Sequence, residues 1–319
     1  MTLVRIAKDW DWPNLLRQTP LCKGVWDGVE FTLDPVEECD YLIMLNNRMK
    51  ETITVRCLRK NIWALLQEPY MSGHNDWMVE GHENFFKVFT HHIPDNDARY
   101  IVSPPAIPWH VNKTFDQLIS SAVPEKPKLI SWVVGDAADL PGHMKRLSFL
   151  RFLQHKSTLD IDLFGRAVQY IEDKWDGLAP YRYSLAIENS SSDDYWTEKL
   201  ADCFLAWSLP FYYGCTNLEK YFPEESFIRI DINQPEESLQ RVKAIIREDD
   251  WEKRIPAIKK ARDLVLHKYQ LFPYVGNLIN SQPKQSGEKA LISIPPYKKS
   301  ARALFFRAFY KLKKKLGKL

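Results

Sequence analysis

The sequence predicts an α/β protein with two Rossmann-like domains and a basic tail. Short apolar runs, each of the length of a buried strand, alternate with polar or helical segments along most of the chain. Five prolines between residues 104 and 127 interrupt this alternation, as expected of a linker between domains. At 319 residues the chain is also long for a single hydrophobic core. We therefore expect one α/β domain over residues 1–125, a second over 126–285, and a tail over 286–319.

The strands of the first predicted domain are marked by three apolar runs, which are rich in aliphatic and aromatic residues. These runs are Tyr41–Leu45, Ile62–Leu66 and Phe86–Phe89. The segments between them, such as 47–60, show no sustained alternation, and we expect them to be helical or irregular.

The second predicted domain begins with a strand at Leu129–Val134 and a helix over 143–155 whose apolar residues recur at helical spacing. A strand at Ile161–Phe164 follows. Residues 183–230 predict the order strand, polar loop, helix, strand, helix, strand. Residues 236–280 are expected to be helical, and Asp249 or Asp250 is a candidate N-cap for the last long helix.

The polar loop after the strand at 183–187 is the candidate ligand site. The loop and the start of the next helix carry Asn189, Tyr195, Glu198 and Lys199. Loops at the carboxyl ends of strands are where open α/β sheets bind ligands. Free backbone N–H groups at a helix start, with a lysine beside them, suit a phosphate. The stretch therefore predicts a donor site for a phosphorylated sugar carrier.

Composition excludes several other classes of protein. The five cysteines are scattered and form no CxxC pair, so neither a disulfide framework nor a zinc site is indicated, and Cys203 and Cys215 are expected to be buried thiols. The first residues lack the apolar core of a signal peptide. No apolar run approaches the ~20 residues of a membrane-spanning helix. We expect a cytoplasmic protein.

The tail is strongly basic, because residues 297–319 contain nine Lys or Arg and no Asp or Glu. A helix from about residue 300 would present one apolar face and one basic face. The apolar face would contain Phe305, Ala308, Phe309, Leu312 and Leu316, and the basic face Arg307, Lys311, Lys314 and Lys318. This pattern favours attachment to an anionic membrane surface over a solvated, disordered tail or a nucleic-acid-binding segment. The basic residues lie outside the motif regions, so we expect the chemistry not to need them.

Four separate motifs in the second domain resemble those of one known family. In order they are Glu188-Asn189-Ser190, Tyr195–Leu200, Pro210–Gly214 and Tyr221–Ile228. Their order and spacing are similar to those of the α-1,3-fucosyltransferases of glycosyltransferase family 10. The resemblance is clear over about 128–232 and looser over about 60–112. It implies the GT-B fold, in which two Rossmann-like domains face a cleft, the first holding a glycan acceptor and the second the nucleotide sugar.

The resemblance also implies roles for residues of the second domain. Arg146, in a segment similar to the family's Arg-x-x-Phe helix, would bind the diphosphate of GDP-fucose, and so would Lys199. Glu198 would hydrogen-bond the sugar or ribose, although side chains of consecutive helical residues are about 100° apart and should point in different directions. Asn189 would contact the sugar or its phosphate. Tyr195 would pack on the donor or form a hydrogen bond with it. Glu188 would contact the donor or orient the loop.

The general base is expected in the first domain, since the family inverts the sugar's anomeric centre and needs one base. The turn in IWALLQEP that contains Glu68 resembles the family's Gln-Glu-Pro turn, and His91 and His92 are rival bases or acceptor-site residues. Gly165 should serve a backbone turn. Weaker phosphate candidates are Arg166 and Arg151. The pairs Asp160/Asp162 and Asp9/Asp11 match a three-letter Asp-x-Asp metal pattern, which is too short to be specific, so we expect no metal and no cofactor.

These observations together predict an inverting α-1,3-fucosyltransferase that moves L-fucose from GDP-fucose to a glycan hydroxyl. It would lie at the inner face of the membrane, held by its tail, and would act in surface glycan or lipopolysaccharide O-antigen synthesis. Two alternatives remain open at this point. One is a transferase for another nucleotide sugar, and the other is a non-catalytic glycan-binding or membrane-surface protein that keeps the fold. The sequence does not specify the acceptor, the linkage or the oligomeric state.

Overall fold

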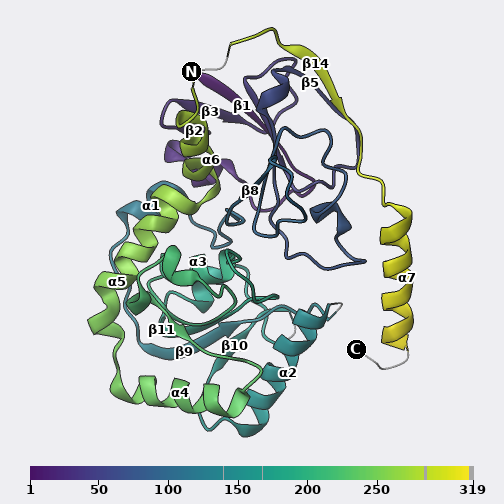
Figure 1. The fold of residues 1–319 in the computed structure, drawn as a ribbon. Coiled ribbons are helices and arrows are strands. Elements are labelled where there is room, and N and C mark those ends of the chain that lie inside the picture. Colours follow the sequence, from purple (N-terminus) through teal and green to yellow (C-terminus); the bar gives the residue numbers. More distant parts are fainter. Residues whose placement is uncertain (139, 167, 284–285, 316–319) are drawn as a thin grey trace. The chain divides into compact units, whose positions relative to one another are not determined.

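The computed structural model describes residues 1–138, 140–166, 168–283 and 286–315 (Figure 1). The chain forms two compact units. Unit 1 comprises Met1–Ala106 and Leu271–Leu319, and unit 2 comprises Ile107–Gln270. These boundaries differ from those expected at 125/126 and 285/286. The chain returns to unit 1 at α6 (Leu271–Asn280), whose buried apolar residues belong to the core of that unit.

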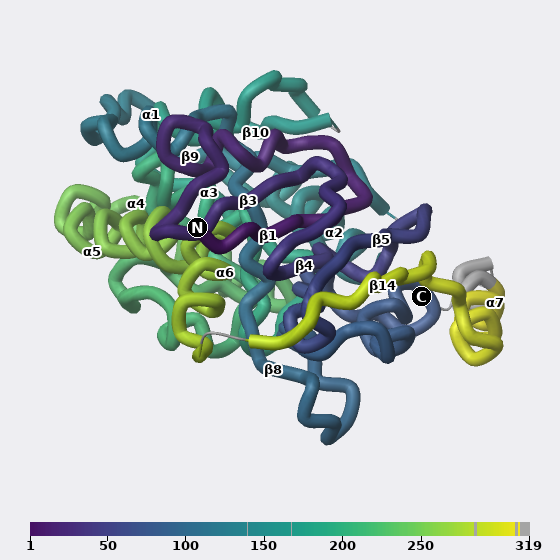
Figure 2. Tube along the Cα trace, turned by 90° about the horizontal axis from the view of Figure 1, so that it is seen from above, coloured from purple at the N-terminus to yellow at the C-terminus, as the bar shows by residue number. Residues whose placement is uncertain are grey.

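Unit 1 is built on a seven-stranded sheet. In spatial order its strands are β2 (Val25–Trp26), β3 (Val29–Thr32), β1 (Thr2–Ala7), β4 (Tyr41–Leu45), β6 (Ile62–Leu65), β7 (Lys87–Thr90) and β8 (Tyr100–Val102). All neighbours are parallel except β2 and β3. A separate antiparallel pair joins β5 (Ile53–Cys57) to β14 (Ala290–Ile294), and Figure 2 shows the two segments running together.

The three strands predicted in this unit are confirmed, with ends shifted by one residue in two of them. Their continuous apolar runs are buried on both faces, as parallel strands are. The prediction for 47–60 was wrong in part, because β5 lies within it. The buried residues of β5 alternate with exposed polar ones. Its partner strand, β14, lies far along the chain.

Unit 2 contains a five-stranded, fully parallel sheet. Its strands, in spatial order, are β10 (Asp162–Phe164), β9 (Lys128–Val133), β11 (Tyr181–Ile187), β12 (Leu209–Tyr213) and β13 (Ile228–Arg229). The chain passes from β9 outward to β10 and then returns to β11 on the other side of β9. The strand order therefore reverses between β9 and β11. Such a reversal is the topological switch point at which α/β sheets of this kind bind ligands.

Helices complete unit 2. They are α1 (Phe115–Ser120), α2 (Pro141–Lys156), α3 (Glu198–Leu205), α4 (Pro235–Glu248) and α5 (Trp251–Leu264), the last continued by a π-turn at Val265–Tyr269. The second helix predicted within 183–230 was wrong, because only 3-10 turns at Leu218–Lys220 and Glu224–Ser226 occur there. Pro223 stands between them and cannot continue a helix. One further 3-10 turn of unit 2 lies at Lys174–Gly177. The 3-10 turns of unit 1 lie at Leu16–Gln18, Pro20–Cys22, Arg59–Asn61 and Asp76–Met78.

Two smaller predictions about unit 2 concern Asp250 and the cysteines. Asp250 stands at the N-cap of α5, as one of the two predicted residues, but its side chain makes no capping hydrogen bond. It pairs instead with Lys253 and Arg254. Cys203 and Cys215 are buried free thiols, as predicted.

The tail forms helix α7 (Ala301–Lys315), so the predicted start near residue 300 is confirmed. Leu304, Phe305, Phe309 and Leu312 are exposed, and the rings of Phe305 and Phe309 stack at 6.4 Å. The side chains of Lys311 and Lys314, together with Leu316 and Lys318, lie outside the described residues. In the described part of the chain, each helix is too short or too polar to cross a membrane.

Candidate donor-binding site

Arg146 occupies the switch point of the sheet in unit 2. It lies on α2, is 4 % exposed, and its guanidinium joins the ends of the two strands that flank the reversal. Nη1 donates to Asn189 Oδ1, just after β11, at 2.5 Å, and Nη2 donates to the Gly135 carbonyl oxygen, shortly after β9, at 3.3 Å. Nε is buried and has no acceptor among the described residues. The fold therefore holds a cationic donor with one unused N–H at its ligand-binding edge.

The close approach of α2 to this edge depends on Gly142. A Cβ at this position would lie 1.7 Å from the carbonyl oxygen of Asn189, which no side chain tolerates. Since Gly142 is in the same helix as Arg146, the glycine sets the distance between the arginine and the end of β11. No pattern along the chain singles out this glycine.

Glu188 is the last buried residue before the loop and anchors the start of α3. Its carboxylate accepts hydrogen bonds from Thr197 N at 2.8 Å and from Thr197 Oγ1, and Lys199 Nζ lies 3.5 Å from its Oε2. Gly214, the glycine of the predicted Pro-x-Tyr-Tyr-Gly strand, passes so close that a Cβ there would lie 2.4 Å from Glu188 Cγ. Glu188 thus connects β11, α3 and the end of β12.

Glu198 and Lys199 face each other, contrary to the expectation that they point in different directions. Lys199 Nζ lies 3.2 Å from Glu198 Oε1 and also donates to Thr197 Oγ1 at 3.2 Å. The lysine side chain is long enough to fold back over the first turn of the helix, where the buried carboxylates attract it. The rotation of about 100° between consecutive helical residues sets the direction of each Cα–Cβ bond. It does not set the position of the ammonium group at the end of the flexible lysine side chain.

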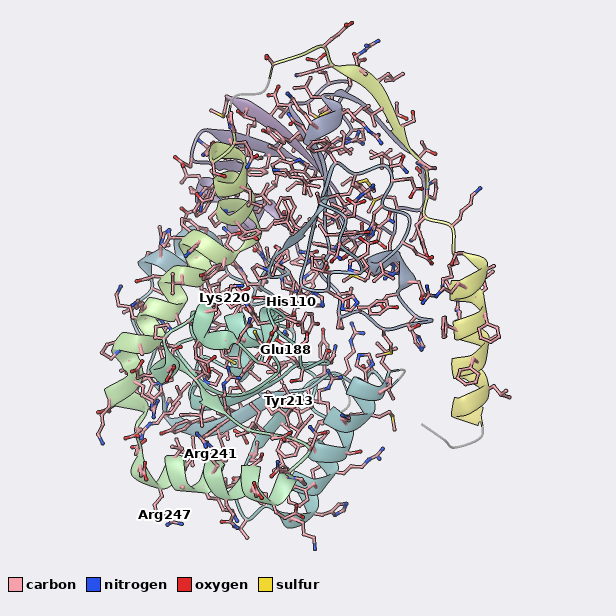
Figure 3. All side chains as sticks on the ribbon, in the orientation of Figure 1. His110, Glu188, Tyr213, Lys220, Arg241 and Arg247 are labelled. Carbon is pink, nitrogen blue, oxygen red and sulfur yellow. The ribbon has the colours of Figure 1, made fainter. Side chains whose placement is uncertain are left out.

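Three further residues of the cluster were not predicted. His110 Nδ1 and Lys174 Nζ each lie 3.8 Å from Glu198 Oε1. Lys174 also pairs at 3.2 Å with Asp202, whose Oδ1 accepts from the backbone N–H of His110. Figure 3 labels Glu188 and His110 in this region of unit 2. Only Asp202 carried a sequence signal, since it follows Glu198 by four residues and therefore shares its helix face.

The pKa shifts follow from burial and from these pairs. Burial raises the pKa of Glu188, and Lys199 opposes this only in part. Burial would also raise the pKa of Glu198, but Lys199, His110 and Lys174 hold it well below its usual value. Burial would lower the pKa of Lys199, but Glu198 and Glu188 hold it above its usual value. Lys199 and Glu198 are therefore both charged at neutral pH.

The backbone N–H groups at the start of α3 are less available than expected. Thr197 N donates to Glu188, and Lys199 N donates to the Thr197 side chain, which caps the helix. An anion bound here would therefore depend on side chains such as Arg146 and Lys199. Tyr195 is 2 % exposed and belongs to the core, and its contact with a donor stays a prediction.

The residues predicted in unit 1 follow the carboxyl ends of neighbouring strands. Glu68 is exposed in the turn after β6, where Gln67 is held by donating to the carbonyl oxygens of Pro105 and Ala106. After β7, the His92 ring stacks on Tyr70 with centroids 4.5 Å apart. The catalytic role of Glu68, and the rival roles of His91 and His92, stay predictions.

The weaker candidates differ in what the structure assigns to them. Gly165 has φ +120° and a Cβ there would lie 1.9 Å from the Val134 carbonyl oxygen, so the predicted backbone role is confirmed. Arg151 is exposed on α2. Asp162 is engaged by Tyr181 and Lys128, and Asp9 pairs with Arg48. No group of three or more His, Cys, Asp or Glu side chains in the described ranges could hold a metal ion.

The geometry of unit 2 agrees with comparisons to known proteins. An α-glucosyltransferase solved with UDP and a 13-mer DNA aligns with 88 % of this chain and 99 % of its own, with a TM-score of 0.50 and 11 % identity. This likeness concerns the fold alone, and it agrees with the predicted GT-B fold. A crystal structure of an α1,3-fucosyltransferase aligns with 86 % of this chain and 93 % of its own at 14 % identity, with a TM-score of 0.49.

A family model matches part of unit 2. Residues 123–253 match the model of glycosyltransferase family 10 (fucosyltransferase), C-terminal part. The mouse 4-galactosyl-N-acetylglucosaminide 3-alpha-L-fucosyltransferase 9 is 30 % identical over 193 residues, which cover 59 % of this chain and 49 % of the relative. The human protein of the same name gives the same figures. The chain thus spans about half the length of the curated relatives it matches.

Proposed function

We propose that the protein transfers L-fucose from GDP-fucose to a hydroxyl of a glycan acceptor. The observation that carries this proposal is Arg146 at the switch point, with an unused N–H and with Lys199 on the neighbouring helix. A departing nucleoside diphosphate develops negative charge, and fixed cations in a low-dielectric site stabilise it without having to reorganise. An arginine fork can also grip two phosphate oxygens.

The choice of fucose rests on the family and on the relatives. Both curated relatives carry the name of a 3-alpha-L-fucosyltransferase, and the matched family is described as fucosyltransferase. The guanosine carrier and the inversion at the anomeric carbon come from the resemblance of the motifs. Inversion is a single direct displacement, so one carboxylate suffices to take the proton of the acceptor hydroxyl. We assign that role to Glu68.

The test is a transfer assay on the full-length chain. The protein is incubated with GDP-fucose and a panel of glycans, and both GDP release and fucosylated product are measured. GDP-mannose serves as the donor that changes the sugar alone, and UDP-galactose as one that changes both the sugar and the base. Product from GDP-fucose alone supports the proposal, and product only from another donor would assign a different nucleotide sugar. Full activity after chelation with EDTA is expected, since Arg146 and Lys199 supply the charge that a metal supplies elsewhere.

A second part of the proposal places the enzyme on the cytoplasmic face of a membrane, in surface glycan or lipopolysaccharide synthesis. It is supported by the exposed apolar stripe of α7 and by its exposed Arg307, within a tail that holds nine basic residues. Each basic residue near an anionic surface contributes about 1 kcal/mol, which salt screens.

Vesicle sedimentation tests this attachment. The intact protein should bind vesicles of anionic lipid and detach as ionic strength rises. The double variant Phe305→Ser/Phe309→Ser should bind more weakly, whereas Phe86→Ser, an exposed phenylalanine outside the tail, should bind normally. Equal binding of all three proteins would contradict membrane attachment through α7.

A further inference from the structure

Asp202 is a buried carboxylate that stands one helical turn after Glu198 in unit 2. It follows Glu198 by four residues on α3 and therefore shares its face of the helix. Its side chain is 1 % exposed. Burial raises the pKa of Asp202, and Lys174 opposes this only in part. A carboxylate buried to this extent is costly unless it is paired, so both of its oxygens need partners.

The first oxygen of Asp202 holds the loop 107–114, which precedes α1. Oδ1 accepts from the backbone N–H of His110 at 2.9 Å and from that of Val111 at 3.4 Å. The next N–H along the chain, that of Asn112, donates to Asp173 Oδ1 at 2.8 Å. These three successive N–H groups donate to side-chain carboxylates and not to a strand, so Asp202 sets the position of His110.

The second oxygen of Asp202 holds Lys174, since Oδ2 lies 3.2 Å from Lys174 Nζ. Lys174 begins the 3-10 turn Lys174–Gly177, and the side chain of Asp173 caps this turn by accepting from Trp175 N at 2.9 Å. One carboxylate therefore fixes groups from two different segments of the chain, His110 from a loop and Lys174 from a turn.

Both of these groups meet at one oxygen of Glu198. His110 Nδ1 and Lys174 Nζ each lie 3.8 Å from Oε1, and Lys199 Nζ lies 3.2 Å from it. Oε2 accepts no hydrogen bond within the described part of the chain, but it is open to solvent and not sealed. Rotating the carboxylate would break the contacts of Oε1, so the open oxygen keeps its direction.

The charge of Glu198 decides what its open oxygen can bind. Lys199, His110 and Lys174 hold the pKa of Glu198 well below its usual value, although burial would raise it. An ionised carboxylate only accepts hydrogen bonds. Oε2 therefore suits a hydroxyl group, which donates, and not a phosphate oxygen, which carries negative charge itself.

We propose that Asp202 is a positioning residue of the donor site and acts through Glu198. It holds His110 and Lys174 against Oε1 and so directs Oε2 toward a hydroxyl group of the bound nucleotide sugar. A group that is already oriented loses less conformational freedom when the ligand binds. The identity of the ligand rests on the proposed function. Ribose and fucose both carry hydroxyl groups, and the choice of ligand in the experiment distinguishes them.

A double-mutant cycle in the full-length chain tests the proposal, with affinities measured by calorimetry. Glu198→Gln should weaken GDP-fucose binding roughly 10-fold or more, since a hydrogen bond to a charged group is lost. Asp202→Asn should weaken it several-fold, because the amide keeps one oxygen for the N–H of His110 but presents its NH₂ group to Lys174. The double variant should bind as Glu198→Gln does, since Asp202 then has no carboxylate left to position.

Two ligands locate the hydroxyl group. GDP carries the ribose but no fucose, so an equal loss of affinity for GDP and for GDP-fucose assigns the hydrogen bond of Glu198 to the ribose. A loss for GDP-fucose alone assigns it to the fucose. Either result supports the positioning role of Asp202.

Lysine variants provide a matched control. Lys174→Gln should weaken GDP-fucose binding several-fold, and Lys174→Arg, which keeps the charge, should restore most of it. Lys113→Gln should bind normally, because Lys113 pairs with Asp173 at 3.9 Å and not with Glu198. The side chain of Lys174 is 25 % exposed, so Lys174→Gln carries the test if Asp202→Asn does not fold. Denaturant titration checks the folding of each variant.

Two results would overturn the positioning role. One is additive losses in the double variant, as expected of a residue that only supports the fold. The other is normal GDP-fucose affinity in both Asp202→Asn and Lys174→Gln. A native protein that binds neither GDP nor GDP-fucose would instead contradict the proposed function, and with it the donor site to which Asp202 is assigned.

Discussion

In unit 2 the buried carboxylates Glu188 and Glu198 lie within 3.5 Å of Lys199 Nζ, whereas in unit 1 the buried Asp76 has an oxygen with no partner. The first arrangement is complete without a ligand apart from Arg146 Nε. The second leaves a carboxylate to be satisfied. Both lie near the carboxyl ends of parallel strands, so the same fold position pairs its buried carboxylates with lysines in unit 2 and leaves one carboxylate oxygen unpaired in unit 1.

Under the proposed function, the arrangement in unit 2 suits a diphosphate. A diphosphate needs cations that are already fixed, since reorganising them during the reaction would cost free energy. The carboxylates of unit 2 hold Lys199 and Lys174 in fixed positions.

The largest effect is expected from Glu68, the proposed base in unit 1. Glu68→Gln keeps the shape of the side chain and removes the base, so turnover should fall ~10²–10⁴-fold while GDP affinity stays unchanged. Rapid-quench kinetics and calorimetry measure the two quantities. Glu83→Gln, an exposed glutamate between β6 and β7, is the control and should be normal. Near-normal turnover of Glu68→Gln would move the role to His91, His92 or another carboxylate of unit 1.

Removal of the cations should affect the donor and not the acceptor sugar. Arg146→Ala and Lys199→Ala should each weaken GDP binding by about 1.5–3 kcal/mol, or roughly 10–150-fold, because each loses a charge-assisted contact. Arg151→Ala, on the same helix as Arg146 but exposed, should bind GDP normally. Calorimetry measures the GDP affinity of each variant, and circular dichroism checks that each variant is folded. Unchanged GDP affinity in both site variants would remove the donor-site assignment.

Replacing a glycine by alanine at two positions tests whether α2 packs against the end of β11 as closely as the contacts of Gly142 imply. Gly142→Ala places a methyl group where the Asn189 carbonyl oxygen lies, so it should lower the free energy of unfolding by on the order of 1–3 kcal/mol and weaken GDP binding. Gly276→Ala, in α6 of unit 1, meets its nearest atom at 3.6 Å and should be stabilising by roughly 0.5–1 kcal/mol. Denaturant titration measures both. Equal effects would show that α2 can shift without loss.

A pH dependence of stability is expected from Lys126, which is buried in unit 2. Lys126 donates to the Ala206 carbonyl oxygen at 2.6 Å and to Ser208 Oγ, both uncharged, and burial lowers its pKa to about 7. The unfolded chain, with a pKa near 10.5, then binds more protons than the folded one between these values. The free energy of unfolding should therefore rise with pH in this window, by up to ~1.4 kcal/mol per pH unit.

The control for Lys126 is Lys126→Met, which cannot titrate. Denaturant unfolding at several pH values should show the rise in the native protein and a flatter profile in the variant. Parallel profiles would mean that Lys126 keeps its charge when folded. The contrast with Lys199, whose pKa burial alone would lower but Glu198 and Glu188 raise, shows that partner charges decide what burial does to a lysine.

The local sequence pattern predicted much of unit 2. Apolar runs of strand length predicted β9 and β10 with each end within one residue of the observed one, because parallel strands are mostly buried and so remain largely apolar. Arg146, Glu188, Asn189, Glu198 and Lys199 could be selected because they lie in short motifs next to predicted strands. Unit 1 was less predictable, since β1, β3 and β5 carry mixed apolar and polar residues.

The α/β class, the motifs around β11 and α3 and the basic amphipathic tail could be read from the chain, since each depends on residues that are close in sequence. The contacts between distant groups depend on packing. His110 reaches Glu198 from a loop and Lys174 from a 3-10 turn, and Ser300 reaches Glu80 across 220 positions of sequence. Such contacts leave no periodic trace, because they are set by how sheets and loops pack and not by the spacing of residues along one element.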